Sequence, residues 1–219
     1  MTVVIPGVSR IAHRLRGSRR GVQGQAREGL LPTEGSAGAF AEAFRLLALS
    51  VRTLLQDRPL KALSVVSAHS GDGRSTVATN LAMALGQDAP TLLLSSFQRG
   101  TGQERGWFRE SVLHARGPQR DGLLATLQEC HLWGQGNGRA GPEDTLTRLL
   151  EETTAAGAYV VIDSPPALLS SDAFWLAQQT RAALYVVRTR PQDMQIHRRV
   201  QESLRRLDVE IIGLVVNEF

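Results

Sequence analysis

The sequence predicts an α/β fold, a three-layer sandwich in which helices cover both faces of a mostly parallel central sheet. The first observation is that short, wholly apolar segments alternate with segments whose apolar residues recur at helical spacing. Strands that are apolar throughout are typical of parallel sheets buried on both faces. The second observation is the composition: the 219 residues are 42% hydrophobic and 21% charged, which suits one globular core and excludes a largely disordered chain.

The predicted elements follow one another in a regular order. Helices are expected where apolar side chains recur at helical spacing, which is the case at residues 39–55, 74–86, 143–155, 171–179 and 193–207. Strands are expected at the short apolar segments, which lie at residues 63–67, 91–95, 158–163, 182–187 and 211–216. Pro59 ends the first helix, and Ser164-Pro165-Pro166 ends the third strand because proline cannot donate a hydrogen bond to a sheet.

Two segments interrupt this order. Residues 97–142 are rich in Gly, Gln and Arg and are expected to be irregular, with a short helix at 122–129 and a short strand at 131–134. Residues 1–38 are expected to form a basic, flexible tail that contains at most a short helix near residues 8–16. The folded domain is therefore predicted to span residues 39–219.

The formal net charge of +4 comes from the N-terminal segment. Residues 1–35 hold six arginines and two glutamates, whereas acidic and basic residues balance in the rest of the chain. This balance excludes a folded face that binds nucleic acid specifically, and it leaves open a contact between the tail and an anionic membrane.

The sequence predicts a cytoplasmic protein. No apolar run approaches the roughly 18 residues of a transmembrane helix, and the N-terminus lacks the apolar region of a secretory signal. Cys130 is the only cysteine, which excludes an internal disulfide framework. Peripheral attachment to the inner membrane stays open.

A candidate phosphate-binding loop lies between the first predicted strand and the helix that follows, which is the position that such loops require. Its residues are Ala68-His69-Ser70-Gly71-Asp72-Gly73-Arg74-Ser75-Thr76. The glycines let backbone N–H groups approach phosphate oxygens, and Ser75 has the position of the hydroxyl that binds nucleotide-bound Mg²⁺. Against the consensus G-x-x-x-x-G-K-[ST], Ala68 replaces the first glycine and Arg74 replaces the lysine. The alternative reading of these nine residues is a plain strand–turn–helix connection.

This loop, together with Val160-Val161-Ile162-Asp163-Ser164-Pro165-Pro166, resembles the bacterial tyrosine kinases of capsule and exopolysaccharide synthesis. These kinases are P-loop ATPases related to the MinD/ParA group, so the resemblance implies a P-loop NTPase-like fold of the MinD type. Further matches in chain order are Glu42-Ala43-Phe44-Arg45, Ser171-Asp172-Ala173, Val186-Val187-Arg188 and Gly213-Leu214-Val215-Val216-Asn217. The resemblance covers about residues 39–219.

The resemblance implies ATP or ADP with Mg²⁺ as the cofactor, held weakly or no longer held. Asp163 corresponds to the Walker B carboxylate; with Ser75 it is the expected metal site, and with Arg74 it is the expected catalytic pair. The expected nucleotide-binding residues are Ser70, Gly71, Asp72, Gly73, Arg74, Ser75, Thr76, Arg99 and Asn217. Each single assignment has a structural alternative: Asp163 could cap a strand end, Arg99 could be a solvated loop residue, and Asn217 could be a turn residue rather than an adenine contact.

Three departures from the family bear on activity. Arg74 replaces a lysine, and a planar guanidinium does not substitute for a compact ammonium at phosphates. The family's apolar triplet followed by Asp-x-Asp-x-Arg reads Leu92-Leu93-Leu94-Ser95-Ser96-Phe97-Gln98-Arg99, so both carboxylates are missing. Because phosphoryl transfer depends on charge neutralisation and a positioned base, these losses are expected to slow it by several orders of magnitude. The family's C-terminal tyrosine cluster is also absent, since Tyr159 and Tyr185 are the only tyrosines.

Three functions fit these features. The leading hypothesis is a degenerate tyrosine-kinase-like protein that acts as a regulatory, ATP-binding partner of a membrane polysaccharide co-polymerase. The alternatives are an active tyrosine kinase or ATPase that uses Arg74 in place of lysine, and a MinD/ParA-like positioning ATPase bound to membrane or nucleoid. Self-association through Glu42 and Arg45 is left open, because Ala48 occupies the third position of the family's Glu-x-x-Arg-x-x-Arg motif.

Overall fold

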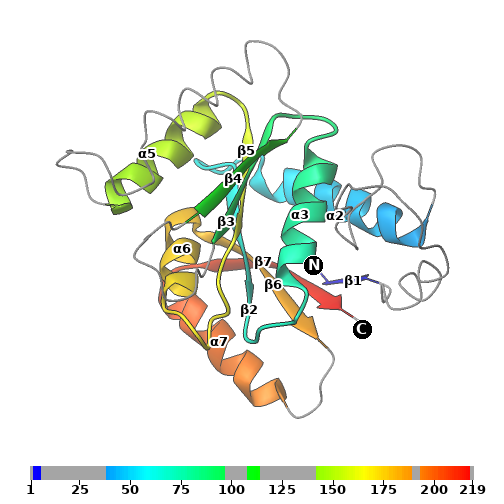
Figure 1. Ribbon diagram of the computed structural model, residues 1–219, viewed down its shortest axis with the longest axis vertical. Coiled ribbons are helices and arrows are strands. Elements are labelled where there is room, and N and C mark those ends of the chain that lie inside the picture. Colours follow the sequence, from blue (N-terminus) through cyan, green and yellow to red (C-terminus); the bar gives the residue numbers. More distant parts are fainter. Residues whose placement is uncertain (1, 6–37, 97–107, 114–141, 189–192, 218–219) are drawn as a thin grey trace, which may run out of the picture.

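The computed structural model describes residues 2–5, 38–96, 108–113, 142–188 and 193–217, and it confirms the α/β fold (Figure 1). The helices are α2 (Ala39–Leu55), α3 (Arg74–Leu85), α5 (Pro142–Ala155), α6 (Asp172–Thr180) and α7 (Met194–Arg206). The strands are β1 (Thr2–Ile5), β2 (Ala62–Ser67), β3 (Thr91–Ser96), β4 (Phe108–Leu113), β5 (Tyr159–Asp163), β6 (Ala182–Arg188) and β7 (Glu210–Asn217). Each helix and each strand expected between residues 39 and 96 and between 142 and 217 is present.

The described strands form one sheet in the order β1-β7-β6-β2-β5-β3-β4. Neighbouring strands are parallel except for β3 and β4, which are antiparallel. Helix α3 leads from β2 to β3 on one side of β2, whereas α6 leads from β5 to β6 on the other side. The connections therefore leave the carboxyl ends of β2 and β5 in opposite directions, which is where open α/β sheets place their ligand crevice.

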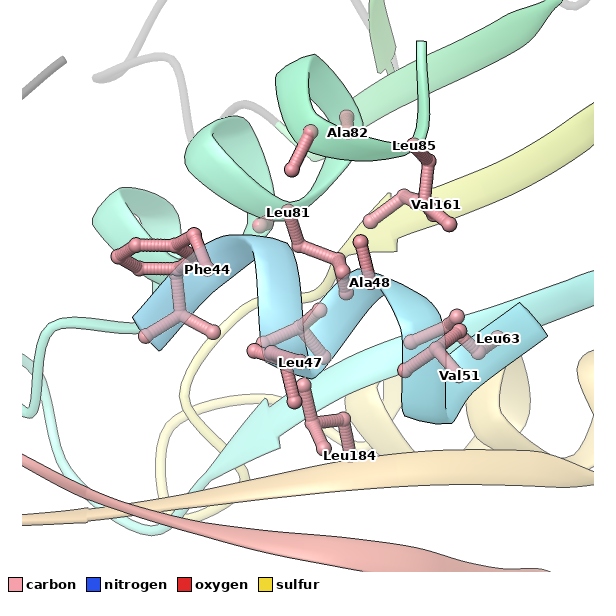
Figure 2. Packing of buried hydrophobic residues seen from close by; sticks show 14 of the residues in the cluster. Phe44, Leu47, Ala48, Val51, Leu63, Leu81, Ala82, Leu85, Val161 and Leu184 are labelled. Atoms are coloured by element: carbon pink, nitrogen blue, oxygen red, sulfur yellow. The ribbon is translucent and has the colours of Figure 1, made fainter. Parts of the chain in front are cut away.

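Helices cover both faces of the sheet. On one face, α2 and α3 pack on alternate side chains of the central strands, with Phe44, Leu47 and Leu81 among the fully buried residues (Figure 2). On the other face, α5, α6 and α7 cover the intervening side chains, which form two apolar clusters. The central strands β2 and β5 are buried along their whole length. This double burial is the reason that these strands are apolar at every position.

The first residues of the chain differ from expectation. Thr2–Ile5 was expected to belong to a flexible tail, but it pairs in parallel with Leu214–Asn217 of β7. The expectation that all of residues 1–38 lie outside the domain is wrong at these positions. Three of the four residues are β-branched and apolar, which favours a strand, and they cover an edge of β7 that would otherwise be unpaired.

The segment expected to be irregular also contains a strand. Phe108–Leu113 forms β4, which pairs with all of β3 in antiparallel register. The helix expected at 122–129, the strand expected at 131–134 and the helix expected near 8–16 lie outside the described residues. Among the helices in the described part of the chain, none has the length and apolar character needed to cross a bilayer.

Candidate functional site

The candidate site lies where β2 and β5 end side by side. The two strands are parallel, and their register places Val65 opposite Asp163, so the loop that follows β2 begins just beyond this carboxylate. Ser95 of β3 pairs with Asp163 on the other side of β5. Sequence positions that are nearly 100 residues apart in the chain are thereby brought to one edge of the sheet.

The loop between β2 and α3 has the backbone of a phosphate-binding turn. Gly71 and Gly73 have φ angles of 84° and 91°, values that favour glycine over residues with a side chain. Gly73 is the N-cap of α3, and no described side chain caps this end of the helix. The first N–H groups of a helix have no intrahelical acceptor and carry partial positive charge, so this end of α3 suits an anion.

Asp72 holds the loop from the inside. Its side chain is almost completely buried, and its Oδ2 accepts a hydrogen bond from the backbone N–H of His69 at 2.9 Å. The backbone carbonyl of Asp72 accepts a hydrogen bond from the Asn217 amide Nδ2, also at 2.9 Å. Asn217 is the last residue of β7 and is itself buried. The two residues therefore tie the loop to the end of β7.

Arg74 points to the sheet edge and contacts two strands. One guanidinium nitrogen donates a hydrogen bond to the Ser67 hydroxyl at the end of β2, at 2.7 Å. Its Nε lies 3.4 Å from Oδ1 of Asp163 at the end of β5. The two charged side chains are only 11% and 10% exposed, so they form a largely buried ion pair. Among the described residues, neither Nε nor Oδ1 has a hydrogen-bond partner, so each atom depends on the charge of the other.

Burial and charge act against each other at this pair. Burial raises the pKa of the Asp163 carboxyl above its usual value, whereas a hydrogen bond with Ser75 and the charge of Arg74 act to lower it. Burial lowers the pKa of Arg74, and the charge of Asp163 opposes that effect. Because an arginine pKa starts far above neutrality, the guanidinium stays charged and is the paired cation of the Asp163 carboxylate.

The arrangement fits a phosphate better than it fits Mg²⁺. Ser75 and Asp163 supply a hydroxyl and a carboxylate, which are oxygen ligands that Mg²⁺ accepts. The cation beside the carboxylate is, however, the guanidinium of Arg74. The residues present do not fit a divalent cation while Arg74 stays in this position.

A second polar cluster adjoins the loop and has no signal in the sequence. The Tyr185 hydroxyl and Nδ1 of His197 lie 3.1 Å apart, and the rings of His197 and His69 meet edge to face. His69 also lies 3.7 Å from a carboxylate oxygen of Asp193. Burial lowers the pKa of His197 from its usual value and raises that of Tyr185. The residues are dispersed along the chain, and His69 alone reads as an ordinary loop residue.

The predicted site residues fall into three groups. The loop residues Ser70–Thr76 gather with Asp163 at one edge of the sheet, and Ser70, Gly71 and Ser75 are exposed there. Asn217 reaches the same loop, where its amide donates to Asp72. Arg99 lies outside the described residues. The roles of these residues in binding a nucleotide remain predictions.

Comparisons with known proteins bear on this geometry. No protein-family model matches the chain. The chain is 25% identical over 191 residues to the tyrosine-protein kinase YwqD of Bacillus subtilis, covering 81% of this chain and 80% of the relative. It is 28% identical over 175 residues to an iron-sulfur cluster carrier protein of Haemophilus influenzae, covering 71% of this chain and 45% of that protein.

Solved structures show the same fold. The kinase domain of the Escherichia coli tyrosine kinase ETK superposes with a TM-score of 0.61 at 20% identity, covering 99% of this chain and 89% of that one. The BceF tyrosine kinase domain gives 0.60 at 17% identity, covering 99% and 92%. The chimerical protein CapA2B2 gives 0.59 at 21% identity, covering 87% and 90%. The resemblance to the bacterial tyrosine kinase family that the motifs predict is therefore confirmed in sequence and in fold.

Proposed function

We propose that this chain is a tyrosine-kinase-like protein that has lost efficient phosphoryl transfer and regulates a polysaccharide assembly machine in the cytoplasm. Its partner would be the membrane co-polymerase that sets chain length in capsule or exopolysaccharide synthesis. The single observation that carries this proposal is the position of Arg74, which pairs with Asp163 and Ser67 at the sheet edge. A side chain held there does not reach over the loop to neutralise phosphates.

The parts needed to hold a phosphate are retained. The turn at Gly71 and Gly73 and the uncapped N-terminus of α3 present backbone N–H groups, and Ser70, Ser75 and Thr76 line the same end of the helix. Backbone donors of this kind bind the phosphates of ATP or ADP without regard to the chemistry that follows. These features support the binding of a nucleotide, but they do not support its turnover.

The parts needed for transfer are missing. Ser95 lies beside Asp163, at the position where the kinases carry a carboxylate, and a serine there cannot serve as the base that activates an acceptor hydroxyl. Among the carboxylates that the kinases carry at this edge of the sheet, Asp163 remains in this chain, and it is paired with Arg74. In this arrangement, the loop would orient phosphates, and Asp163 would position Arg74 rather than a reacting group.

Phosphate release tests the loss of turnover. Purified protein with ATP and Mg²⁺ is expected to release no more phosphate than an Asp163→Ala variant under the same conditions. A variant that restores Arg74→Lys, Ser95→Asp and Phe97→Asp together is expected to exceed both. Wild-type turnover clearly above the Asp163→Ala background would contradict the proposal and favour an active enzyme that uses Arg74.

Association with the co-polymerase is tested separately. The full chain should bind the purified cytoplasmic segment of the co-polymerase whose gene lies nearest to its own gene. A Glu42→Ala, Arg45→Ala variant should still bind that segment with a measurable affinity. Glu42 and Arg45 pair at 3.2 Å on the exposed face of α2, whereas Ala48 is buried against the core. We therefore propose that self-association through this helix is weak.

The basic residues 6–37 are proposed to contact anionic membrane. Flotation of the protein with anionic vesicles would test this contact.

A further inference from the structure

We infer that Arg74 is a built-in counter-ion of Asp163 that takes the place of a divalent cation, so that any phosphate ligand of this loop is bound without metal. The inference concerns the two side chains themselves. It deepens the proposed function only in naming the ligand class, a metal-free phosphate ester such as ADP.

The first step is the geometry of the two acceptors. Ser67 and Asp163 end neighbouring parallel strands, and Arg74 reaches both through different nitrogens, at 2.7 Å and 3.4 Å. A guanidinium presents several donors in a rigid plane, so it can bridge acceptors on two strands at once. Lysine carries its donors on a single nitrogen and is a point charge. The Lys-to-Arg replacement in this loop is therefore matched to its surroundings.

The second step is burial. Asp163 is 7% exposed, and a carboxylate in such a place needs a compensating charge. Its Oδ1 has no hydrogen-bond partner among the described residues, and the nearest charge to it in an ion pair is that of Arg74. Removal of one member of a buried pair leaves the other uncompensated, which costs far more than the pair contributes. Arg74 is thus required by Asp163 whether or not a ligand is bound.

The third step is exclusion of the metal. Mg²⁺ binds carboxylate oxygens at about 2.0–2.1 Å in a strict octahedron. To reach Oδ1, it would have to approach a fixed positive charge that lies 3.4 Å from the same atom. Two cations that share one carboxylate oxygen repel each other, and this repulsion is stronger beside a buried carboxylate than in bulk water. Asp163, the carboxylate among the two expected metal ligands, is therefore already engaged by Arg74.

The test uses Mg²⁺ alone as the probe, with the full chain and no nucleotide. Thermal unfolding is followed with millimolar Mg²⁺ and with NaCl at equal ionic strength, because salt screens surface charges in either case. The variants are Arg74→Ala, Asp163→Asn and the two together. The matched control is Arg52→Ala, which breaks the exposed ion pair between Arg52 and Asp88 away from the loop.

The expected pattern is specific. The wild type and Arg52→Ala should show the same midpoint in Mg²⁺ and in NaCl. Arg74→Ala should have a lower midpoint in NaCl and recover part of the loss in Mg²⁺, because the freed carboxylate now accepts a metal. Asp163→Asn in the Arg74→Ala background should abolish this recovery.

Two results would overturn the inference. The first is a Mg²⁺-specific rise of the wild-type midpoint that Asp163→Asn removes, because the metal would then displace Arg74. The second is an Arg74→Ala variant that folds but shows no Mg²⁺ response. If Arg74→Ala does not fold, Arg74→Gln gives the same comparison with a neutral side chain of similar reach. Neither readout depends on turnover or on a polysaccharide partner, so the proposed function can fail while this inference stands.

Discussion

Helix α2 and the loop between β2 and α3 adjoin the same strand and the same helix, but different forces hold them. The inner face of α2 is apolar, and Phe44, Leu47, Val51 and Leu55 are fully buried there. Figure 2 shows the first three of these side chains. The loop is held by hydrogen bonds from buried polar groups and by one buried ion pair. The apolar region keeps the kinase fold at low sequence identity, because cores tolerate exchange among apolar residues of similar volume.

The polar region responds differently to substitution. A hydrogen bond or ion pair has a fixed geometry, so one exchange such as Lys to Arg redirects the groups around it. In this chain the change at Arg74 involves Ser67, Asp163 and Ser75 together. The comparison teaches that apolar packing can preserve a fold while an exchange of one residue alters the polar contacts at the carboxyl edge of the sheet.

The largest effect is expected from the apolar region. Phe44→Ala removes a fully buried ring from the apolar cluster that α2 forms with α3 and the sheet, and it should lower the free energy of unfolding by about 3–5 kcal/mol. Chemical denaturation measures this loss. Leu49→Ala is the matched control on the same helix, because Leu49 is 60% exposed and should change stability little. Similar losses for both variants would contradict the assignment of the two faces.

A smaller effect is expected where the loop is tied to β7. Asn217→Ala leaves the buried carbonyl of Asp72 without its donor and should cost about 1–3 kcal/mol. Because the loop loses an anchor, ADP binding should weaken as well. The same denaturation experiment, followed by a titration with ADP, checks both outcomes. A stable variant with unchanged ADP affinity would show that Asn217 does not position the loop.

The cluster beside the loop predicts a dependence on pH. Burial lowers the pKa of His197 below its usual value of 6.5, so the unfolded chain takes up a proton before the folded one does. The free energy of unfolding should therefore be highest above that usual value and fall as the pH drops through and below it. Asp72, His69, Asp193 and Tyr185 face the same ring. Denaturation at a series of pH values measures the slope.

A His197→Gln variant separates this contribution from those of the other titrating groups. The variant should show a shallower slope near neutral and mildly acidic pH than the wild type. An identical slope in both proteins would assign the dependence to other groups.

The smallest effect is expected at the exposed ion pair of α2. Arg45 and Glu42 are 46% and 60% exposed, and breaking such a pair by Glu42→Ala should change stability by no more than about 0.5 kcal/mol. The sedimentation behaviour of the protein should not change either. A shift from an oligomer to a monomer in Glu42→Ala would instead show that this face joins copies of the chain.

The sequence predicts the apolar layers well, for a physical reason. Strands such as 159–163 and helices such as 194–206 carry their period in consecutive residues, so local pattern is sufficient to place them. Strands β1 and β4 were not predicted because they lie at the two edges of the sheet, where one neighbour alone stabilises each of them. Strand β1 pairs with β7, which is distant in the chain, and β4 pairs with β3. Local composition, rich in Arg and Gly around both, favours irregular structure.

The site was only partly predictable. Two sequence motifs identify most of its residues. The fold brings these motifs to adjacent strand ends, because β2 and β5 are parallel neighbours. The direction of Arg74 could not be predicted, because it depends on acceptors that two different strands supply. The same limit applies to Tyr185 and His197, whose contact joins β6 to α7 without any motif.

The most direct test of the central claim is a calorimetric titration of the wild-type protein with ADP, once in Mg²⁺ and once in EDTA. If Arg74 takes the place of the metal, the two dissociation constants should agree within about threefold, a difference below 1 kcal/mol. Binding that is tenfold or more tighter in Mg²⁺, about 1.4 kcal/mol or greater, would contradict the account, because Asp163 would then be serving a metal.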